Sequence, residues 1–404
     1  MEEHHHAGNF DTQINVTNTT LGLTGSTSAE FRAIKILFYF IILACSTLGN
    51  GLVAYIICST RSMKTSSNFL ILNLAVCDLL TPLISIPFDF AVEESNYQWL
   101  YGEYMCKTLW PAATLTATSS ALTLALISLD RYRLIMHPFK PRLTTKQIKL
   151  AIACIYVISV ALVTPYVTML GVKDGSCTEN WPRFVYRQVY TVVLFCFQYA
   201  LPLPFMITMY ALALVNLYSA TRKTTKMISK AASPAQIYRV GDNMNGMTTK
   251  ETKLLKKSLK TQQEHYANQR ATKMFITVVT VFAVCMLPNQ AAWLWMDFGG
   301  HVSDSFNTAS IVCWLFTYTN SVVNPVIFTF FSKDFRHGMQ DVFKKLCQWS
   351  YTEFDSSRRS SVSGSRRPSN ACAFVSQSNS TLVSNTSYRP MTPDMNVSSS
   401  ETML

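Results

Sequence analysis

The stretch LTATSSALTLALISLDRY, residues 115–132, decides the fold. It belongs to an apolar run at 105–135 and ends in the charged triplet Asp130-Arg131-Tyr132. A helix that crosses a bilayer needs roughly 20 mostly apolar residues, so this run is long enough to span a membrane. Six further runs share that length and character: 34–58, 69–92, 148–170, 189–217, 271–296 and 306–331. Because helices satisfy every backbone polar group in lipid, we predict an all-α membrane protein, a seven-transmembrane helix bundle.

Composition and charge agree with a membrane protein and indicate its orientation. Of the 404 residues, 49% are hydrophobic and only 14% are charged, whereas soluble domains average about 25% charged. With the N-terminus outside, the outer segments contain six of the 35 basic residues and twelve of the 23 acidic ones. Basic residues collect on the cytoplasmic side, so we predict a multi-pass plasma-membrane protein with an outer N-terminus and a cytoplasmic C-terminus. The net charge of +12 then belongs to this topology and does not indicate nucleic-acid binding.

This topology divides the chain into segments. Residues 1–33 form an extracellular tail, in which Asn15 and Asn18 begin glycosylation triplets of the Asn-X-Thr type. Residues 34–331 form the bundle, interrupted by a cytoplasmic loop at about 222–269. A basic amphipathic stretch near the end of that loop favours either an extension of the sixth helix or a charged linker.

The cysteines divide in the same way. Of the eleven, only Cys106 and Cys177 lie in outer segments. The outer environment is oxidising, so we predict one disulfide between these two residues. The other cysteines lie in spans or on the cytoplasmic side, where packing is the simplest role.

The cytoplasmic end of the chain combines a short helix with a predicted disordered tail. Within residues 332–349, large apolar residues alternate with basic ones, a pattern that suits an eighth helix lying in the membrane interface. Cys347 near its end is a candidate for palmitoylation. Residues 350–404 are rich in Ser, Thr and Asn and are predicted to be disordered. Their candidate regulatory sites are Ser361 and Ser369 for phosphorylation, which would recruit arrestin-type partners, and Thr402 with Leu404 for binding to a PDZ domain.

Polar side chains inside the spans are the main functional candidates, because a charge or amide in lipid is costly. Asp78 is the only acid near the middle of the membrane. Its polar neighbours at similar depth are Asn50, Ser120, Asn320, Ser321 and Asn324. One carboxylate among neutral oxygens can hold a small cation such as sodium, with Asp78 as the metal ligand, or a proton. The alternative is a structural hydrogen-bond network that joins the helices. No other cofactor is expected.

Together these residues resemble the motifs of the rhodopsin-like (class A) G-protein-coupled receptors. The resemblance covers residues 34–349 and rests on Gly49-Asn50, the run NLAVCD at 73–78, Asp130-Arg131-Tyr132, Pro202 with Tyr210, Phe282 with Cys285-Met-Leu-Pro288, and Asn324-Pro325-Val-Ile-Phe328 followed by Phe335-Arg336. Prolines in the fifth, sixth and seventh spans can kink those helices and so permit a two-state motion.

The resemblance implies a role for each group of residues. Arg131 would reach a heterotrimeric G protein once the sixth helix moves outward, with Asp130 restraining it at rest. The implied coupling set is Asp130, Arg131, Tyr132, Tyr210, Asn324, Pro325 and Phe328. The implied sodium site is Asp78, Ser120, Asn320, Ser321 and Asn324, with Asn50 beside it. The implied connector between ligand and helix motion is Ala121, Pro202 and Phe282, followed by Met286 and Pro288.

Four positions depart from the family pattern. Met286 replaces the usual Trp of the sixth helix, and Phe328 replaces a Tyr whose hydroxyl bridges to Tyr210 in the active state. Asn268 stands where many members place a Glu that pairs with the arginine, and Tyr156 stands where the fourth span usually has Trp. An altered switch and a weaker resting lock are implied. A receptor that binds its ligand but couples poorly to G proteins is therefore an alternative.

The sequence argues against several ligand classes and two other functions. Retinal requires a Lys in the seventh span, and none occurs at 306–331. Amine receptors carry an Asp in the third span at the position of Ala113. A transporter that uses Asp78 would be expected to show inverted repeats, which are absent from the sequence. Enzyme activity is not expected, because the sequence contains no nucleophile–base set, metal cluster or phosphate loop. A non-peptide ligand stays open, but bombesin-type and neuropeptide Y/neuropeptide FF-type receptors look similar around 287–290 and 319–325, which favours a peptide.

Acidic residues rim the expected ligand entrance. They are Asp89, Glu94, Glu179 and Asp297. Asp297 lies about two and a half helical turns beyond Pro288, and neuropeptide Y/FF-type receptors use an acid there to bind a ligand arginine. We therefore hypothesise a basic, C-terminally amidated neuropeptide anchored by an arginine on Asp297; the alternative is an ordinary solvated loop charge. The remaining ligand-binding candidates are Ala113, Asn289, Gln290 and Trp293.

Overall fold

The structure is a computed structural model that describes residues 29–95, 98–137, 140–231, 249–299 and 304–359. The chain divides into two compact units, Met1–Met339 and Gln340–Leu404. The first unit contains the helix bundle. The glycosylation, phosphorylation and PDZ candidates Asn15, Asn18, Ser361, Ser369, Thr402 and Leu404 lie outside the described residues.

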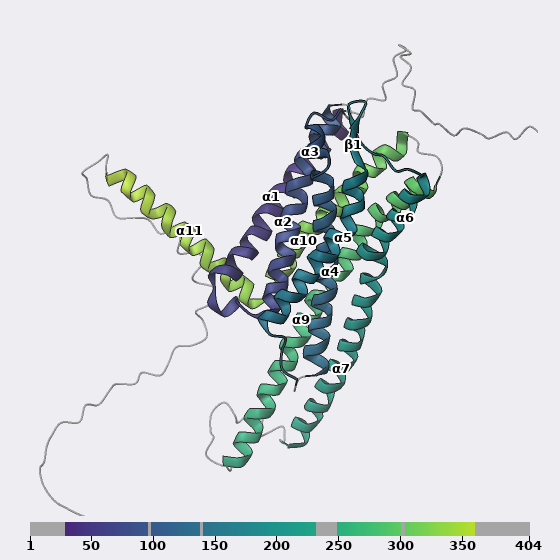
Figure 1. Cartoon of the computed structure of the whole chain (residues 1–404). Coiled ribbons are helices and arrows are strands. Elements are labelled where there is room, and N and C mark those ends of the chain that lie inside the picture. The colour runs from purple at the N-terminus through teal and green to yellow at the C-terminus, as the bar shows by residue number, and fades with distance from the viewer. Residues whose placement is uncertain (1–28, 96–97, 138–139, 232–248, 300–303, 360–404) are drawn as a thin grey trace, which may run out of the picture. The chain divides into compact units, whose positions relative to one another are not determined.

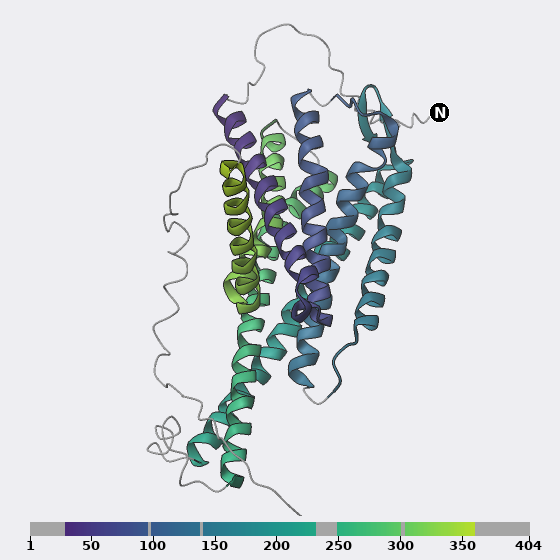
Figure 2. The ribbon, with the colours of Figure 1, turned by 90° about the vertical axis from the view of Figure 1, so that its left-hand side faces the viewer.

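In the described part of the chain, seven helical segments are long and apolar enough to cross a membrane, which confirms the predicted bundle. Figure 1 and Figure 2 show these helices packed side by side. They are α1 (Ala29–Ser59), α2 (Ser66–Glu94), α3 (Gly102–Cys106) with α4 (Leu109–Met136), α5 (Thr145–Met169), α6 (Phe184–Phe195) with α7 (Pro202–Ala231), α9 (Thr249–Phe298) and α10 (Asp304–Phe331). Exposed apolar side chains such as Phe40, Val157 and Val215 cover the outside of the bundle, as lipid-facing positions require.

Side-chain caps and a short turn set where two of the helices begin. A 3-10 turn, η1 (Arg61–Met63), follows α1. Thr65 then caps α2 by accepting a hydrogen bond from the backbone N–H of Asn68 at 3.3 Å. Thr144 and Gln147 form a capping box at the start of α5, in which each side chain satisfies a backbone donor of the first turn.

The fifth span is not a single regular helix. Between α6 and α7 lies a π-helical turn, η2 (Cys196–Ala200), closed by a bond from Leu201 N–H to the carbonyl of Cys196 at 2.9 Å. The next residue, Pro202, has no N–H to donate to the preceding turn. The wider turn buries Gln198, whose Nε2 donates to Thr118 Oγ1 of α4 at 2.9 Å.

One glycine lets two distant helices approach closely. A Cβ added at Gly49 in α1 would lie 3.0 Å from Cβ of Pro325 in α10. A larger residue would push these helices apart, and with them the polar side chains of Asn50 and Asn324.

A β-hairpin that we did not predict covers one end of the bundle. Strands β1 (Leu170–Lys173) and β2 (Ser176–Glu179) pair antiparallel through a turn at Asp174 and Gly175, which both have positive φ. Asp-Gly is a frequent hairpin turn, so this dipeptide could have identified it. The predicted disulfide is present: Cys177 of β2 is bonded to Cys106 of α3, with a Cα–Cα distance of 5.7 Å.

Several helices extend further than the apolar runs indicated. Figure 1 and Figure 2 show α7 and α9 extending beyond the other helices at one end. The sixth helix begins at Thr249, so the basic stretch before 271 prolongs it. A further helix, α11 (Lys333–Arg359), follows α10. The predicted end at 349 was ten residues short, because 350–359 contains no Gly or Pro to stop the helix.

Candidate functional site

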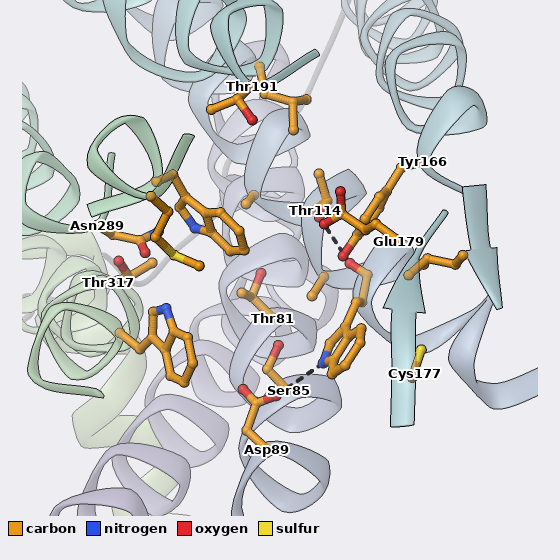
Figure 3. Close-up of a pocket in the computed structure, with 18 of the residues that line it drawn as sticks. Thr81, Ser85, Asp89, Thr114, Tyr166, Cys177, Glu179, Thr191, Asn289 and Thr317 are labelled. Carbon is orange, nitrogen blue, oxygen red and sulfur yellow. Dashed lines mark hydrogen bonds between the residues drawn. The ribbon is translucent and has the colours of Figure 1, made fainter. Parts of the chain in front are cut away.

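A cavity of about 600 Å³ opens in the bundle beneath the hairpin. Its walls come from α2, α4, α5, α6, α9 and α10, together with β1 and β2. Figure 3 shows side chains from these elements converging on one space. Six of the predicted ligand-binding residues line it: Asp89, Ala113, Glu179, Asn289, Gln290 and Trp293. The cavity size falls in the range of about 300–1,000 Å³ that is usual for ligand sites.

Asp297 is not placed where we expected it. It does not line the cavity, and only 3% of its surface is exposed. Nε of Arg187, from α6, lies 2.9 Å from Oδ1, and the hydroxyl of Thr191 donates to Oδ2. Gln188 Nε2 also donates to the Asp297 carbonyl at 2.7 Å. Asp297 therefore joins α9 to α6, and an arginine of the chain itself occupies the position that we expected for a ligand arginine.

Glu94 also faces away from the cavity, and its neighbour faces in. Glu94 is paired with Arg32 of α1 and is absent from the cavity wall, whereas Glu93 lines it. Glu93 is held by Lys35 Nζ at 2.5 Å and by the hydroxyl of Tyr39 at 3.0 Å. Adjacent positions of a helix point in different directions, so an acidic pair at a helix end does not by itself show which member faces inward.

Asp89 is fixed by two neutral hydrogen-bond donors. Trp110 Nε1 donates to Oδ1 at 3.3 Å, the bond marked from Asp89 in Figure 3. The hydroxyl of Tyr318 donates to Oδ2 at 2.5 Å. These bonds join α2 to α4 and α10, and they hold the carboxylate at the cavity wall.

Amide side chains continue inward from the cavity wall. Gln290 Nε2 donates to Gln198 Oε1 at 3.1 Å, and Gln198 in turn donates to Thr118 of α4. Gln198 is a functional candidate that sequence reasoning missed, because its inward orientation depends on the π-helical turn. Asn289 also lines the cavity, and its buried Oδ1 accepts no hydrogen bond from the residues that the structure describes.

The residues predicted to connect ligand binding to helix motion lie beside the cavity, toward the interior of the bundle. Met286 lines the cavity, and Phe282, one turn further along α9, is fully buried. The Phe282 ring stacks against Tyr199, with centroids 6.3 Å apart. Ala121 of α4 is also fully buried. Contact at Met286 can therefore be transmitted to the packed interior of α9.

Two residues of the predicted polar network, Ser120 and Asn324, bond directly to Asp78. Ser120 Oγ donates to Oδ1 at 3.1 Å, and Asn324 Nδ2 donates to Oδ2 at 2.6 Å. Asn50 Nδ2 donates to the backbone carbonyl of Ser321 at 2.9 Å. Ser46, which we did not predict, donates to the Asp78 carbonyl at 2.9 Å. The network thus links α1, α2, α4 and α10.

The donor set around Asp78 fits a small hard cation. The buried amide oxygens of Asn50, Asn320 and Asn324 accept no hydrogen bond from the described protein atoms. Buried acceptors normally have a partner, and a carboxylate with neutral oxygens is the ligand type that hard cations prefer.

At the end of the bundle opposite the hairpin, Asp130 and Arg131 do not pair with each other. Asp130 accepts a hydrogen bond from Ser67 of α2 at 2.7 Å. The Arg131 guanidinium lies over the ring of Phe275, 4.9 Å from its centroid, and its buried Nε has no hydrogen-bond partner among the described atoms. Within the described residues, no carboxylate oxygen lies within the 4.0 Å ion-pair limit of Arg131. The resting ion pair that we expected is therefore absent from this structure.

Phe328 belongs to an aromatic cluster beside Arg131. Its ring lies 6.3 Å from that of Phe275 and stacks 5.9 Å from that of Phe335. Tyr210 is buried at the same end of the bundle. Tyr132 is partly buried, as are most residues of the last turn of α4. Phe328 thus makes an apolar contact at the position where the family pattern has a tyrosine hydroxyl.

A cavity at one end of a seven-helix bundle and the Asp130-Arg131-Tyr132 triplet at the other are the arrangement of a transmembrane receptor. Residues 49–328 match the family described as 7 transmembrane receptor (rhodopsin family). The chain belongs to this family.

Curated relatives match most of the chain. It is similar to the neuropeptide FF receptor 2 of Mus musculus, with 30% identity over 340 residues that cover 79% of this chain and 74% of the relative. It is also similar to the galanin receptor type 1 of Homo sapiens, with 28% identity covering 77% and 82%. The allatostatin-A receptor of Bombyx mori is 28% identical, covering 77% and 79%.

Proposed function

We propose that this protein is a plasma-membrane receptor for an extracellular, basic, amidated neuropeptide and that it activates heterotrimeric G proteins. The observation that carries the proposal is the cavity of about 600 Å³, built from six helices and the hairpin. It lies at the end of the bundle opposite Arg131. The N-terminus would be outside, which agrees with the distribution of charge along the sequence.

The peptide class is supported by the relatives and by the chemistry of the cavity. The relatives are named for neuropeptide FF, galanin and allatostatin-A. Asp89, Glu93 and Glu179 line the cavity, against Arg187 as the basic residue among its described lining. This excess of acid favours a cationic ligand.

Activation would require α9 to move outward at its cytoplasmic end. Arg131 has no ion-pair partner among the described residues, so the motion would separate its guanidinium from Phe275 and free it for the G protein. Pro288, inside α9, removes one backbone hydrogen bond and gives the helix a place to bend.

Sodium bound at Asp78 would oppose this motion. The ion would neutralise the carboxylate and satisfy the free oxygens of Asn50, Asn320 and Asn324. A cation that binds the resting bundle more tightly shifts the equilibrium toward that state.

Modification and regulatory partners complete the proposal. Asn15 and Asn18 would carry glycans, and Cys347, which is exposed on α11, would carry palmitate. Phosphate on Ser361 and Ser369 would attract arrestin-type proteins. Thr402 and Leu404 would bind a PDZ domain.

The test is a screen of cells that express the full chain against a library of amidated neuropeptides, with calcium and cyclic AMP as readouts. We expect activation by at least one basic peptide and none in matched cells without the chain. A complete lack of response, together with a lack of binding at confirmed surface expression, would contradict the proposal.

A second candidate is a peptide-binding receptor that couples poorly to G proteins. It is favoured by Met286 at the cavity wall and by the apolar stacking of Phe328. Nucleotide exchange measured with a peptide that binds separates the two functions, because only the first predicts faster exchange.

A further inference from the structure

The acids around the cavity differ in how their charge is balanced. Glu93 has Lys35 Nζ at 2.5 Å. Arg187 Nε lies 2.9 Å from Asp297 and 3.8 Å from Glu179. Among the acids described at the cavity, Asp89 alone has no basic nitrogen within the 4.0 Å limit. One carboxylate of the cavity wall therefore lacks a cation from the described part of the chain.

The surroundings of Asp89 orient its charge without neutralising it. Trp110 Nε1 and the Tyr318 hydroxyl bond to separate carboxylate oxygens, and neither donor carries a charge. Asp89 is partly buried, and a partly desolvated carboxylate is stabilised more by a cation than by neutral donors. The carboxylate is also held in one position, so a ligand would not have to order it.

We propose that Asp89 is the subsite that binds the positive group of the ligand, and that this group is a guanidinium. The proposal rests on the proposed function, in which the cavity receives a basic peptide. Trp110, Trp314 and Tyr318 line the cavity with Asp89, and Trp110 and Tyr318 contact its carboxylate. A guanidinium is planar, weakly hydrated and able to stack on aromatic rings, so it suits this wall better than an ammonium does.

Asp297 is a poor alternative for the same role. A ligand cation would have to displace Arg187 from a carboxylate whose side chain is fully buried. The fixed positive charge would also repel the incoming group. Glu179 shares Arg187 with Asp297. These acids at the entrance can attract a cation toward the cavity, and Asp89 can then hold it inside.

The first test needs no peptide. In the full chain in membranes, Ala113→Cys places a thiol on the cavity wall, one turn along α4 from Trp110 and on the same face. The reaction rate of this thiol is measured by mass spectrometry with two methanethiosulfonates, one carrying trimethylammonium and one carrying sulfonate. We expect the cationic reagent to be favoured and Asp89→Asn to lower the rate ratio roughly tenfold, because one lost charge acts oppositely on the two reagents.

The matched control is Glu103→Gln, which removes an acid of α3 that lies outside the cavity wall and pairs with Lys107 at 2.5 Å. The rate ratio should stay within about twofold of the parent in that variant. Asparagine keeps the shape and one acceptor of Asp89, and surface expression of each variant is verified. A ratio that Asp89→Asn leaves unchanged would overturn the proposal.

The second test uses neuropeptide FF, galanin and an allatostatin-A peptide as probes. For any probe that activates the receptor, each arginine is replaced by citrulline and each lysine by acetyl-lysine. We expect one citrulline replacement to weaken activation of the parent receptor about a hundredfold. In the Asp89→Asn variant, the same replacement should cause no further loss of activation. Additive losses would overturn the proposal, and loss only with acetyl-lysine would overturn the choice of a guanidinium.

The two tests separate this proposal from the proposed function. If no probe activates the receptor, the peptide class is in question, but the reagent ratio still decides whether Asp89 is the cation subsite. If a probe activates the receptor and the ratio does not depend on Asp89, the function stands and the subsite is wrong.

Discussion

Each end of the bundle contains a charged side chain without an ion-pair partner among the described residues, and the two charges have opposite sign. At the end covered by the hairpin, Asp89 is an anion held by the neutral donors Trp110 and Tyr318. At the opposite end, Arg131 is a cation that lies over the Phe275 ring, and its Nε has no hydrogen-bond partner among the described residues. Both side chains are partly buried, and a charge that loses water without gaining a counter-charge is costly, so each of them favours a partner from outside the chain.

The two ends differ in how firmly they hold that charge. Asp89 has two hydrogen bonds that fix both carboxylate oxygens, so its geometry exists before any ligand arrives. Arg131 has one cation–π contact, which is worth only about 0.5–2 kcal/mol. The difference indicates a preformed site outside and a readily released group inside.

The largest expected effect comes from removing the cytoplasmic cation. Arg131→Ala should abolish agonist-stimulated nucleotide exchange while surface expression and peptide affinity stay near those of the parent. The matched control is Arg133→Ala, which removes a cation from the last turn of the same helix. Exchange that persists in Arg131→Ala at matched expression would show that Arg131 has no coupling role.

A second unbalanced anion can be created at the outer end. Arg187→Ala leaves the buried Asp297 carboxylate without its cation, which should destabilise the folded receptor by about 3–5 kcal/mol. Thermal unfolding of the purified full chain measures this loss. Asp297→Asn should cost clearly less, because Arg187 is partly exposed and keeps Glu179 as a partner. Equal losses in the two variants would mean that the buried anion is not the source of the cost.

Asp78, the carboxylate of the polar network, lies between the two ends of the bundle. Agonist affinity should be about tenfold lower in a buffer that contains sodium than in one that contains a bulky organic cation. A tenfold change is a typical coupling between two binding sites. Asp78→Asn should remove this sensitivity, and Asp89→Asn should retain it. An agonist affinity that is indifferent to sodium in the parent would leave Asp78 with a purely structural role.

The smallest expected effect concerns the ring beneath Arg131. Phe275→Leu keeps an apolar side chain of similar volume but removes the cation–π contact. We expect basal nucleotide exchange to rise about two- to fivefold, in line with a loss of roughly 0.5–1 kcal/mol. The rise should disappear in Phe275→Leu/Arg131→Ala. A basal rate that falls in Phe275→Leu would mean that the contact belongs to the active state instead.

The fold and the polar network could be predicted because their determinants are local or depend on depth. Length and apolarity define the seven spans, and residues at similar depth, such as Asp78 and Asn324, meet once the helices pack. Ser46 was missed because serine is common in membrane helices and costs little there. The hairpin was not predicted, although Asp174-Gly175 is a typical hairpin dipeptide.

The role of individual acids could not be predicted in this way. Asp297 is paired with Arg187, and no spacing in the sequence links two residues so far apart. Glu93 and Glu94 are neighbours whose orientations depend on the rotation of α2. The pairing of charges is a tertiary property, so an acid count predicts the sign of the outer field but not which acid remains available.

The disulfide-linked hairpin has a consequence for how quickly a ligand can enter and leave. Cys177 is bonded to Cys106, and the Gly175 carbonyl accepts a hydrogen bond from Trp99 N–H at 2.7 Å. The middle of the hairpin and its tip are thus both anchored, so this cover does not act as a lid that must swing open. Binding partners without a slow opening step typically associate at about 10⁵–10⁷ M⁻¹s⁻¹. Potent and weak agonists of this receptor should then differ mainly in how long they stay bound.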